Sequence, residues 1–217
     1  VVETEKSLSK GKKPDLIIWP ENSVDVDPFN YAKIGSVISS LVDKADVPLI
    51  IGAVLRTDGQ LQNVSILWEP KTGATTRYVK RHLTPFGEVV PLRSALTFFS
   101  DLPSQVEDFS PGKSAVIHQV GQAKIAPIIC FELIDDRLIQ SSASQSNLFV
   151  VQTNSATFAN TAESAQQLAI TRIRSIEHAR YSVSVSTVGI SAIVDTNGIV
   201  LKSTKENIAT SINSAVA

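Results

Sequence analysis

Short runs rich in β-branched and other apolar residues recur along this 217-residue chain, and most are of strand length rather than helix length. Turn sequences such as Asp58-Gly59 and Asn197-Gly198 separate some neighbouring runs and favour tight hairpins, so part of the sheet structure is predicted to be antiparallel. The predicted strands are Asp15–Trp19, Pro48–Leu55, Asn63–Trp68, Thr75–Lys80, Ala115–Val120, Lys124–Cys130, Leu148–Thr153, Ser182–Thr187, Ser191–Asp195 and Ile199–Lys202.

Helical patterns lie between these strands. The clearest runs from about Glu163 to Arg180, where apolar residues recur at three- and four-residue spacing, and a second spans Ala32 to Lys44. This mixed order predicts an α/β domain in which helices cover the sheets, rather than an all-β sandwich. A chain of this length favours a single domain. The stretch from Pro85 to Gly112 has few periodic signals and is predicted to be a long functional loop.

Composition excludes several classes of function. With 20 basic and 21 acidic residues, the chain carries no electrostatic footprint for nucleic acid and no polybasic membrane-binding run. Its apolar stretches are far shorter than the roughly 20 residues that span a bilayer. A single cysteine excludes an internal disulfide framework and a multi-cysteine zinc site.

That cysteine, Cys130, ends an apolar run and is followed by acidic residues typical of the first turn of a helix running towards Gln140. We therefore predict that it lies on a strand-to-helix elbow. There the helix N-terminus would favour the thiolate, and the next backbone N–H would face a developing oxyanion. The alternative is a buried, unreactive cysteine, because free cysteine is among the most buried residue types.

A cysteine nucleophile needs a base, and histidine is the usual one. None of His82, His118 and His178 has surroundings like those of cysteine proteases. His118 falls in a predicted strand and His178 on the long helix, so core or surface roles are favoured for both.

Two charged residues at strand ends are the other candidates. Glu21 directly follows a buried strand that ends at Pro20, where desolvation would raise its pKa towards that of a useful base. Lys80 closes another strand, and its positive charge would stabilise a thiolate and an anionic intermediate if the two met Cys130. Taken singly, each is equally well explained as a solvated charge at a strand end.

Three motifs in order resemble those of a known family. Trp19–Glu21, Lys80–Leu83 and Cys130–Glu132 resemble the Glu, Lys and Cys motifs of the nitrilase (carbon-nitrogen hydrolase) superfamily. Within it, the segment KRHLTPFGEVVPL from Lys80 to Leu92 and the helix from Gln166 to Arg180 are similar to the apolipoprotein N-acyltransferase branch.

The resemblance implies an αββα fold, with two mixed sheets packed face to face and helices outside. It also implies a bacterial membrane enzyme that uses no cofactor and no metal. Such an enzyme moves a fatty acyl chain from a phospholipid donor, through a cysteine thioester, to the N-terminal amine of a diacylglyceryl-cysteine lipoprotein. Its catalytic domain lies on the extracytoplasmic face, and we expect a monomer.

The resemblance further implies roles for individual residues. The implied catalytic residues are Glu21 as general base, Lys80 as the group that stabilises oxyanion and thiolate, and Cys130 as nucleophile. The implied supporting residues are Glu88 in positioning or proton transfer, the backbone N–H of Phe131 in the oxyanion site, and Glu132 around the cysteine.

Residues 1–217 are expected to form one catalytic domain. The resemblance places its first strand and the N-terminal transmembrane helices outside this chain. An alternative is a soluble amidase that hydrolyses a small amide or nitrile with the same three residues. A non-catalytic domain is disfavoured because all three residue types are present. The apolar residues that suit either a lipid-facing loop or ordinary loop packing are Leu92, Leu96, Phe98, Phe99 and Leu102.

Overall fold

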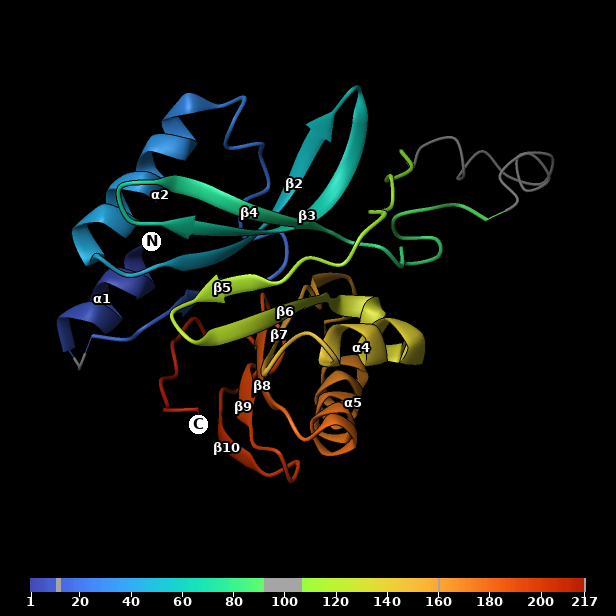
Figure 1. The fold of residues 1–217 in the computed structure, drawn as a ribbon. Coiled ribbons are helices and arrows are strands. Elements are labelled where there is room, and N and C mark those ends of the chain that lie inside the picture. The colour runs from blue at the N-terminus through green and yellow to red at the C-terminus, as the bar shows by residue number, and fades with distance from the viewer. Residues whose placement is uncertain (11–12, 92–106, 160, 217) are drawn as a thin grey trace.

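Two mixed β-sheets pack face to face with helices on their outer sides in the computed structural model, which describes residues 1–10, 13–91, 107–159 and 161–216 (Figure 1). This confirms the predicted fold class. Each of the predicted strands has a counterpart, with bounds that differ by a few residues.

The first sheet has the strand order β1-β2-β3-β4. Strand β1 runs parallel to β2, and the other pairs are antiparallel. The β2–β3 hairpin turns at Asp58 and Gly59, whose φ angles of 50° and 80° are those of the tight turn predicted from the sequence. The strands are β1 (Ile17–Ile18), β2 (Leu49–Thr57), β3 (Gln60–Glu69) and β4 (Gly73–Val79).

The second sheet has the order β10-β9-β8-β7-β6-β5. Its central strands β6, β7 and β8 are parallel, and the outer pairs are antiparallel. The strands are β5 (His118–Val120), β6 (Ala123–Ile129), β7 (Leu148–Thr153), β8 (Tyr181–Ser186), β9 (Ala192–Val194) and β10 (Val200–Ser203).

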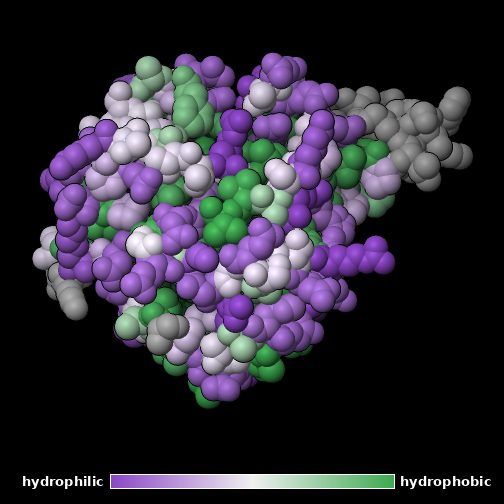
Figure 2. Space-filling model, viewed as in Figure 1, coloured by the Kyte–Doolittle hydropathy of each residue, from purple (hydrophilic) through white to green (hydrophobic). Residues whose placement is uncertain are grey.

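Successive side chains of a buried strand point to opposite faces of its sheet and so pack in two different layers. In β7, Leu148 and Val150 join the cluster between the two sheets, whereas Phe149 and Val151 join the cluster beneath helix α4 (Asp136–Ala143). Such a strand is apolar on both faces because each face is covered. The face drawn in Figure 2 is accordingly mostly hydrophilic, with hydrophobic side chains reaching it only in small areas.

Helix α2 (Ala32–Ala45) covers the first sheet, and α4 and α5 (Glu163–His178) cover the second (Figure 1). Helix α1 (Val2–Lys10) precedes β1. A short 3-10 segment, η3 (Ala156–Phe158), precedes α5. No helix of the described residues is long and apolar enough to cross a membrane.

Two segments around the site differ from, or only partly test, their predicted local structure. The helix predicted to follow Cys130 is divided into a 3-10 turn, η2 (Cys130–Ile134), and the separate helix α4, because Asp135 takes an extended conformation and caps α4 by accepting the N–H of Leu138. The predicted loop Pro85–Gly112 contains no helix or strand in its described parts, 85–91 and 107–112. Its apolar residues Leu92, Leu96, Phe98, Phe99 and Leu102 lie outside the described residues.

Candidate active site

The ends of three strands meet at one buried place. Glu21 follows β1, Lys80 follows β4 and Cys130 follows β6, so the first two come from one sheet and the third from the other. The side chains of Glu21 and Lys80 are 6% and 1% exposed, which excludes the alternative that they are ordinary solvated charges. Both charges act on the Cys130 thiol.

Lys80 is the centre of the charge network. Its Nζ lies 2.6 Å from Glu88 Oε2 and 3.5 Å from Glu21 Oε1, and it donates to Thr84 Oγ1 at 3.1 Å. Burial disfavours the ammonium, but attraction to Glu21 and Glu88 outweighs burial and raises the pKa of Lys80. Lys80 is therefore a fixed positive charge rather than a proton donor.

Asn63, on β3, connects the two carboxylates. Its Nδ2 donates to Glu21 Oε1 at 2.7 Å and to Glu88 Oε1 at 2.6 Å. Burial raises the pKa of Glu21 despite the opposing effects of Lys80 and Asn63. Glu88 is also penalised by burial, but Lys80 and Asn63 lower its pKa overall. The two carboxylates are thereby differentiated, which is typical of acid–base sites.

Cys130 occupies the left-handed region with a φ of 49°, an unusual conformation for a residue other than glycine that marks a tight elbow. Its Sγ accepts a hydrogen bond from Gln167 Nε2 of α5 at 3.5 Å. Burial, reinforced by the negative charge of Glu21, raises the pKa of the thiol to about 12, although Lys80 acts in the opposite direction. The expectation that a helix N-terminus favours a resting thiolate is therefore wrong for this structure.

Glu132 connects the cysteine elbow to the lysine strand. Its Oε2 accepts the N–H of Ile129 at 2.8 Å, while Oε1 accepts the hydroxyl of Tyr78 at 2.6 Å and the N–H of Arg81 at 2.7 Å. Glu132 is fully buried. One carboxylate therefore binds the backbone N–H of Ile129, which precedes Cys130, and the backbone N–H of Arg81, which follows Lys80.

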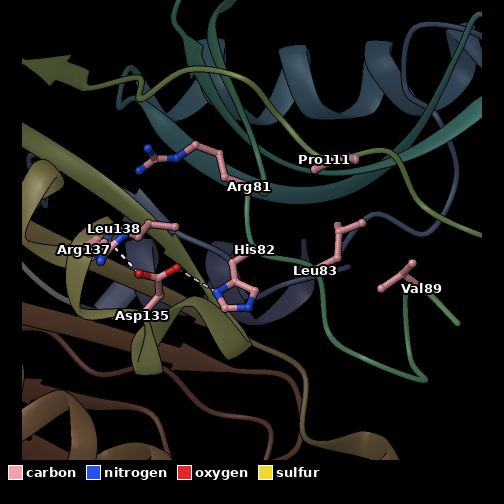
Figure 3. A pocket seen from close by; sticks show the side chains of 8 residues that line it. All are labelled: Arg81, His82, Leu83, Val89, Pro111, Asp135, Arg137 and Leu138. Atoms are coloured by element: carbon pink, nitrogen blue, oxygen red, sulfur yellow. Dashed lines mark hydrogen bonds and ion pairs between the residues drawn. The ribbon is translucent and has the colours of Figure 1, made fainter. Parts of the chain in front are cut away.

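The remaining residues singled out in the sequence lie around this centre. Phe131 places its ring edge-on to His82, with 5.1 Å between ring centroids. His82 in turn pairs with Asp135 through Nδ1 at 2.8 Å, as Figure 3 shows. His118 is buried between the sheets and His178 lies on α5, in agreement with the structural roles favoured from the sequence.

An open groove of about 630 Å³ begins at Arg81 and His82, directly after Lys80 in the chain, and Figure 3 shows the side chains that line it. Apolar side chains form much of its wall, and Arg81 and His82 connect it directly to Lys80 along the chain. The lining residues are Arg81, His82, Leu83, Val89, Pro111, Asp135, Arg137 and Leu138.

Four residues of the site were not identified from the sequence: Asn63, Tyr78, Glu163 and Gln167. The first two lie inside predicted strands and the last two on the predicted long helix, where polar residues carry no distinguishing signal. Only the structure reveals them, through the hydrogen bonds of Asn63, Tyr78 and Gln167 and the charge of Glu163 around Cys130 and its neighbours. The described residues contain no group of three or more His, Cys, Asp and Glu side chains that could hold a metal ion.

Comparison with known proteins finds the family that the three sequence motifs resemble. The carbon-nitrogen hydrolase family matches residues 5–215. Apolipoprotein N-acyltransferases of Mycolicibacterium smegmatis and Geobacter metallireducens are 36% and 30% identical to the chain over 87% and 85% of its length. These matches cover 33% and 36% of the two relatives, so the chain spans about a third of their length.

Solved structures show the same fold at low sequence identity. A carbon-nitrogen hydrolase from Helicobacter pylori superposes with a TM-score of 0.70 at 18% identity, covering 94% of this chain and 78% of that one. An amidase from Nesterenkonia, with an acetamide moiety covalently added at its active-site cysteine, gives 0.68 at 13% identity, covering 95% and 76%.

Proposed function

The chain belongs to the carbon-nitrogen hydrolase family, and on that basis we propose that it is the catalytic domain of an apolipoprotein N-acyltransferase. The proposed reaction moves a fatty acyl chain from a phospholipid to the α-amino group of a diacylglyceryl-cysteine lipoprotein. Relatives named for this activity, 27–36% identical over most of the chain, support this branch over the amidases, which are similar in fold.

One observation supports the chemistry most directly: a fully buried ammonium, Lys80, lies between two carboxylates and acts on the thiol of Cys130. Removing an ion pair from water costs free energy that the attraction between its charges does not always recover, so a purely structural site of this kind would be expensive. The arrangement instead suits a reaction in which negative charge develops beside the lysine.

In the first half-reaction, Glu21 takes the proton of the Cys130 thiol as sulfur attacks the ester carbonyl of the phospholipid. A thiol with a pKa of about 12 is protonated at rest, so proton removal accompanies attack. Lys80 and the backbone N–H of Phe131 stabilise the oxyanion. The carbon–oxygen bond then breaks, Glu21 returns the proton to the leaving lysophospholipid oxygen, and a thioester remains.

In the second half-reaction, the lipoprotein amine attacks the thioester. Glu21 accepts a proton from the amine, the carbon–nitrogen bond forms, the carbon–sulfur bond breaks, and the proton passes to the thiolate. The products are an amide and the free Cys130 thiol. Glu88 remains ionised throughout and keeps Lys80 in place, in keeping with its lowered pKa.

The groove beside the site suits an amphiphilic donor. Leu83, Val89 and Leu138 offer apolar contacts for an acyl chain, and Arg137 offers a positive charge for a phosphate. We further propose that the whole protein is a bacterial membrane enzyme whose catalytic domain lies on the extracytoplasmic face of the membrane. In this proposal the first strand of the domain and the membrane helices are encoded outside these 217 residues.

The test is to incubate the complete gene product, in detergent, with phosphatidylethanolamine carrying an alkyne-labelled acyl chain. The expected result is one acyl group on Cys130 by peptide mass spectrometry, removable by hydroxylamine, and then transferred to a synthetic diacylglyceryl-cysteine peptide. Cys130→Ala abolishes loading while the protein stays folded. Release of ammonia from small amides without acyl loading would identify an amidase instead, and undiminished activity of Cys130→Ala would exclude a cysteine enzyme.

A further inference from the structure

Helix α5 presents two polar residues to Cys130 that the proposed mechanism does not use. Gln167 donates to the sulfur at 3.5 Å, and the negative charge of Glu163 acts on the same thiol. The two residues are four positions apart, so they lie on one face of the helix, one turn above the other. Glu21 and Lys80 approach the thiol from the strand ends, which leaves α5 as a separate wall of the site.

One oxygen of Glu163 lacks a partner. Its Oε2 is buried and accepts no hydrogen bond from the described residues. A buried carboxylate oxygen without a donor is unfavourable, because it has lost its hydration without gaining a compensating hydrogen bond. A substrate that brings an N–H donor, above all a cationic one, would remove this penalty.

The other charges at the site are already paired. The positive charge of Lys80 is shared between Glu88 at 2.6 Å and Glu21 at 3.5 Å, and Asn63 donates to both carboxylates. Glu163 belongs to neither of these interactions. A ligand that approaches Cys130 along α5 therefore meets a negative charge that Lys80 does not balance directly.

Resting on the acyltransferase function proposed above, we propose that Glu163 binds the ammonium form of the incoming acceptor amine beside the Cys130 thioester. An α-amino group is mostly protonated at neutral pH. From Glu163, the ammonium first releases one proton to solvent, and the free amine then attacks the thioester carbon while Glu21 takes a second proton from its nitrogen. The carbon–nitrogen bond forms as the carbon–sulfur bond breaks, and the proton held by Glu21 passes to the thiolate.

This role gives the site a means to choose amine over water. Both nucleophiles can reach a thioester, but only the ammonium gains a charge-assisted bond to Glu163. Gln167, bonded to the sulfur, positions the acyl group against that side of the site. Glu163 is thus a specificity-determining residue of the second half-reaction, because only there does an ammonium reach the site.

The experiment compares Glu163→Gln with the unchanged full-length enzyme in three assays: acyl loading from labelled phosphatidylethanolamine, transfer to a diacylglyceryl-cysteine peptide, and transfer to hydroxylamine. Hydroxylamine is neutral at pH 7, so it does not need a carboxylate. The KM for the peptide is expected to rise about 10-fold or more, because the variant loses one charge-assisted hydrogen bond to the ammonium. Loading persists in the variant, and the reaction with hydroxylamine changes far less than the reaction with the peptide.

Two further variants complete the design. Glu163→Asp keeps the charge and is expected to recover part of the affinity for the peptide. Glu177→Gln removes a charge from the same helix, where it pairs with Arg174 at 2.7 Å, and is expected to leave the KM unchanged.

A second readout follows the thiol itself, which faces Glu21, Lys80, Glu163 and Gln167. Removing the charge of Glu163 removes one of the influences that raise the pKa of Cys130, so alkylation by iodoacetamide becomes faster at a given pH. The acceleration checks that the charge of Glu163 acts on the thiol, and an unchanged rate would contradict the placement on which the proposal rests.

The proposal is overturned if Glu163→Gln leaves the KM for the peptide unchanged, or if it slows the peptide and hydroxylamine equally. Either result is distinguishable from failure of the acyltransferase function, in which the unchanged enzyme itself loads no acyl group from the phospholipid.

Discussion

Glu21 and Glu88 share two neighbours, and their pKa values are nevertheless shifted in opposite directions. Both accept from Asn63 and both face Lys80, but Glu88 lies 2.6 Å from the ammonium and also accepts the N–H of Thr84 at 2.8 Å. Glu21 lies farther from Lys80, at 3.5 Å, and burial dominates its pKa. At the residue scale, this asymmetry supports the proposal that Glu21 is the proton acceptor and Glu88 the permanent anion.

Replacing Asn63 with leucine tests this assignment. The Asn63 hydrogen bond lowers the pKa of Glu21, so its removal raises that pKa further and shifts the acidic limb of the rate profile to higher pH. We expect kcat/KM for acyl loading to fall about 10-fold at pH 7. Ser65→Ala, on the same strand but bonded to His118, is the control. An unshifted acidic limb would contradict Glu21 as the base.

Glu132 gives a second test at the residue scale, this time of stability. Both oxygens of Glu132 accept hydrogen bonds from N–H or O–H groups. In Glu132→Gln one oxygen is replaced by an amide NH₂, which is itself a donor and cannot accept these bonds. Leaving such buried donors unpaired lowers the free energy of unfolding by about 1–3 kcal/mol, which urea denaturation measures. Tyr78→Phe removes only one donor and is expected to cost less. Equal stability of Glu132→Gln and the unchanged protein would refute the connecting role.

At the scale of elements, the site depends on how closely the end of β1 packs on β2. Gly52 of β2 leaves no room for a side chain, because a Cβ there would lie 2.4 Å from the oxygen of Pro20 and 2.7 Å from the Cα of Glu21. The glycine thus allows the two backbones to approach, and the approach places Glu21 opposite Lys80.

We therefore expect Gly52→Ala to displace Glu21 and to lower kcat for acyl loading on the order of 100-fold, since displacements near 1 Å have effects of that size. Single-turnover measurements of thioester formation check this. Gly121→Asn serves as the control, because its position is open and its φ of 57° suits asparagine. Loading at the normal rate in Gly52→Ala would show that the approach is not required.

At the scale of the whole molecule, His118 connects the two sheets. It lies on β5 of the second sheet, and its ring nitrogens contact Ser65 at 3.3 Å and Thr76 at 2.6 Å on the first sheet. Burial lowers its pKa to about 4 from the usual 6.5. The folded protein therefore keeps the ring neutral in a pH range where the unfolded chain takes up a proton.

Because the folded-state pKa is depressed, the stability contribution of His118 is complete above about pH 6.5 and declines as the pH falls towards 4. The expected loss over this window is about 3 kcal/mol. Denaturation curves of the unchanged protein and of His118→Gln measure it, and the variant is expected to show a flatter dependence. His178→Gln, on α5, removes a histidine without touching the sheet interface. An identical slope in His118→Gln would disprove the account.

Much of the architecture could be predicted from local pattern. Short runs rich in branched residues identified the strands, and Asp58-Gly59 identified the β2–β3 hairpin, because strand preference and positive φ are properties of single residues and their neighbours. The helix after Cys130 was predicted less well. Its division at Asp135 depends on bonds to Leu138 and His82, and the latter is distant in sequence.

The sequence by itself determined that Glu21, Lys80 and Cys130 each follow an apolar strand, and its three motifs indicated the family to which the chain belongs. Only the tertiary structure decided that Lys80 carries a permanent charge and that the thiol is protonated at rest. The physical reason is that burial and charge pairing act through space. They depend on which strands become neighbours, and the distances between Lys80 and its carboxylates exist only once both sheets are packed.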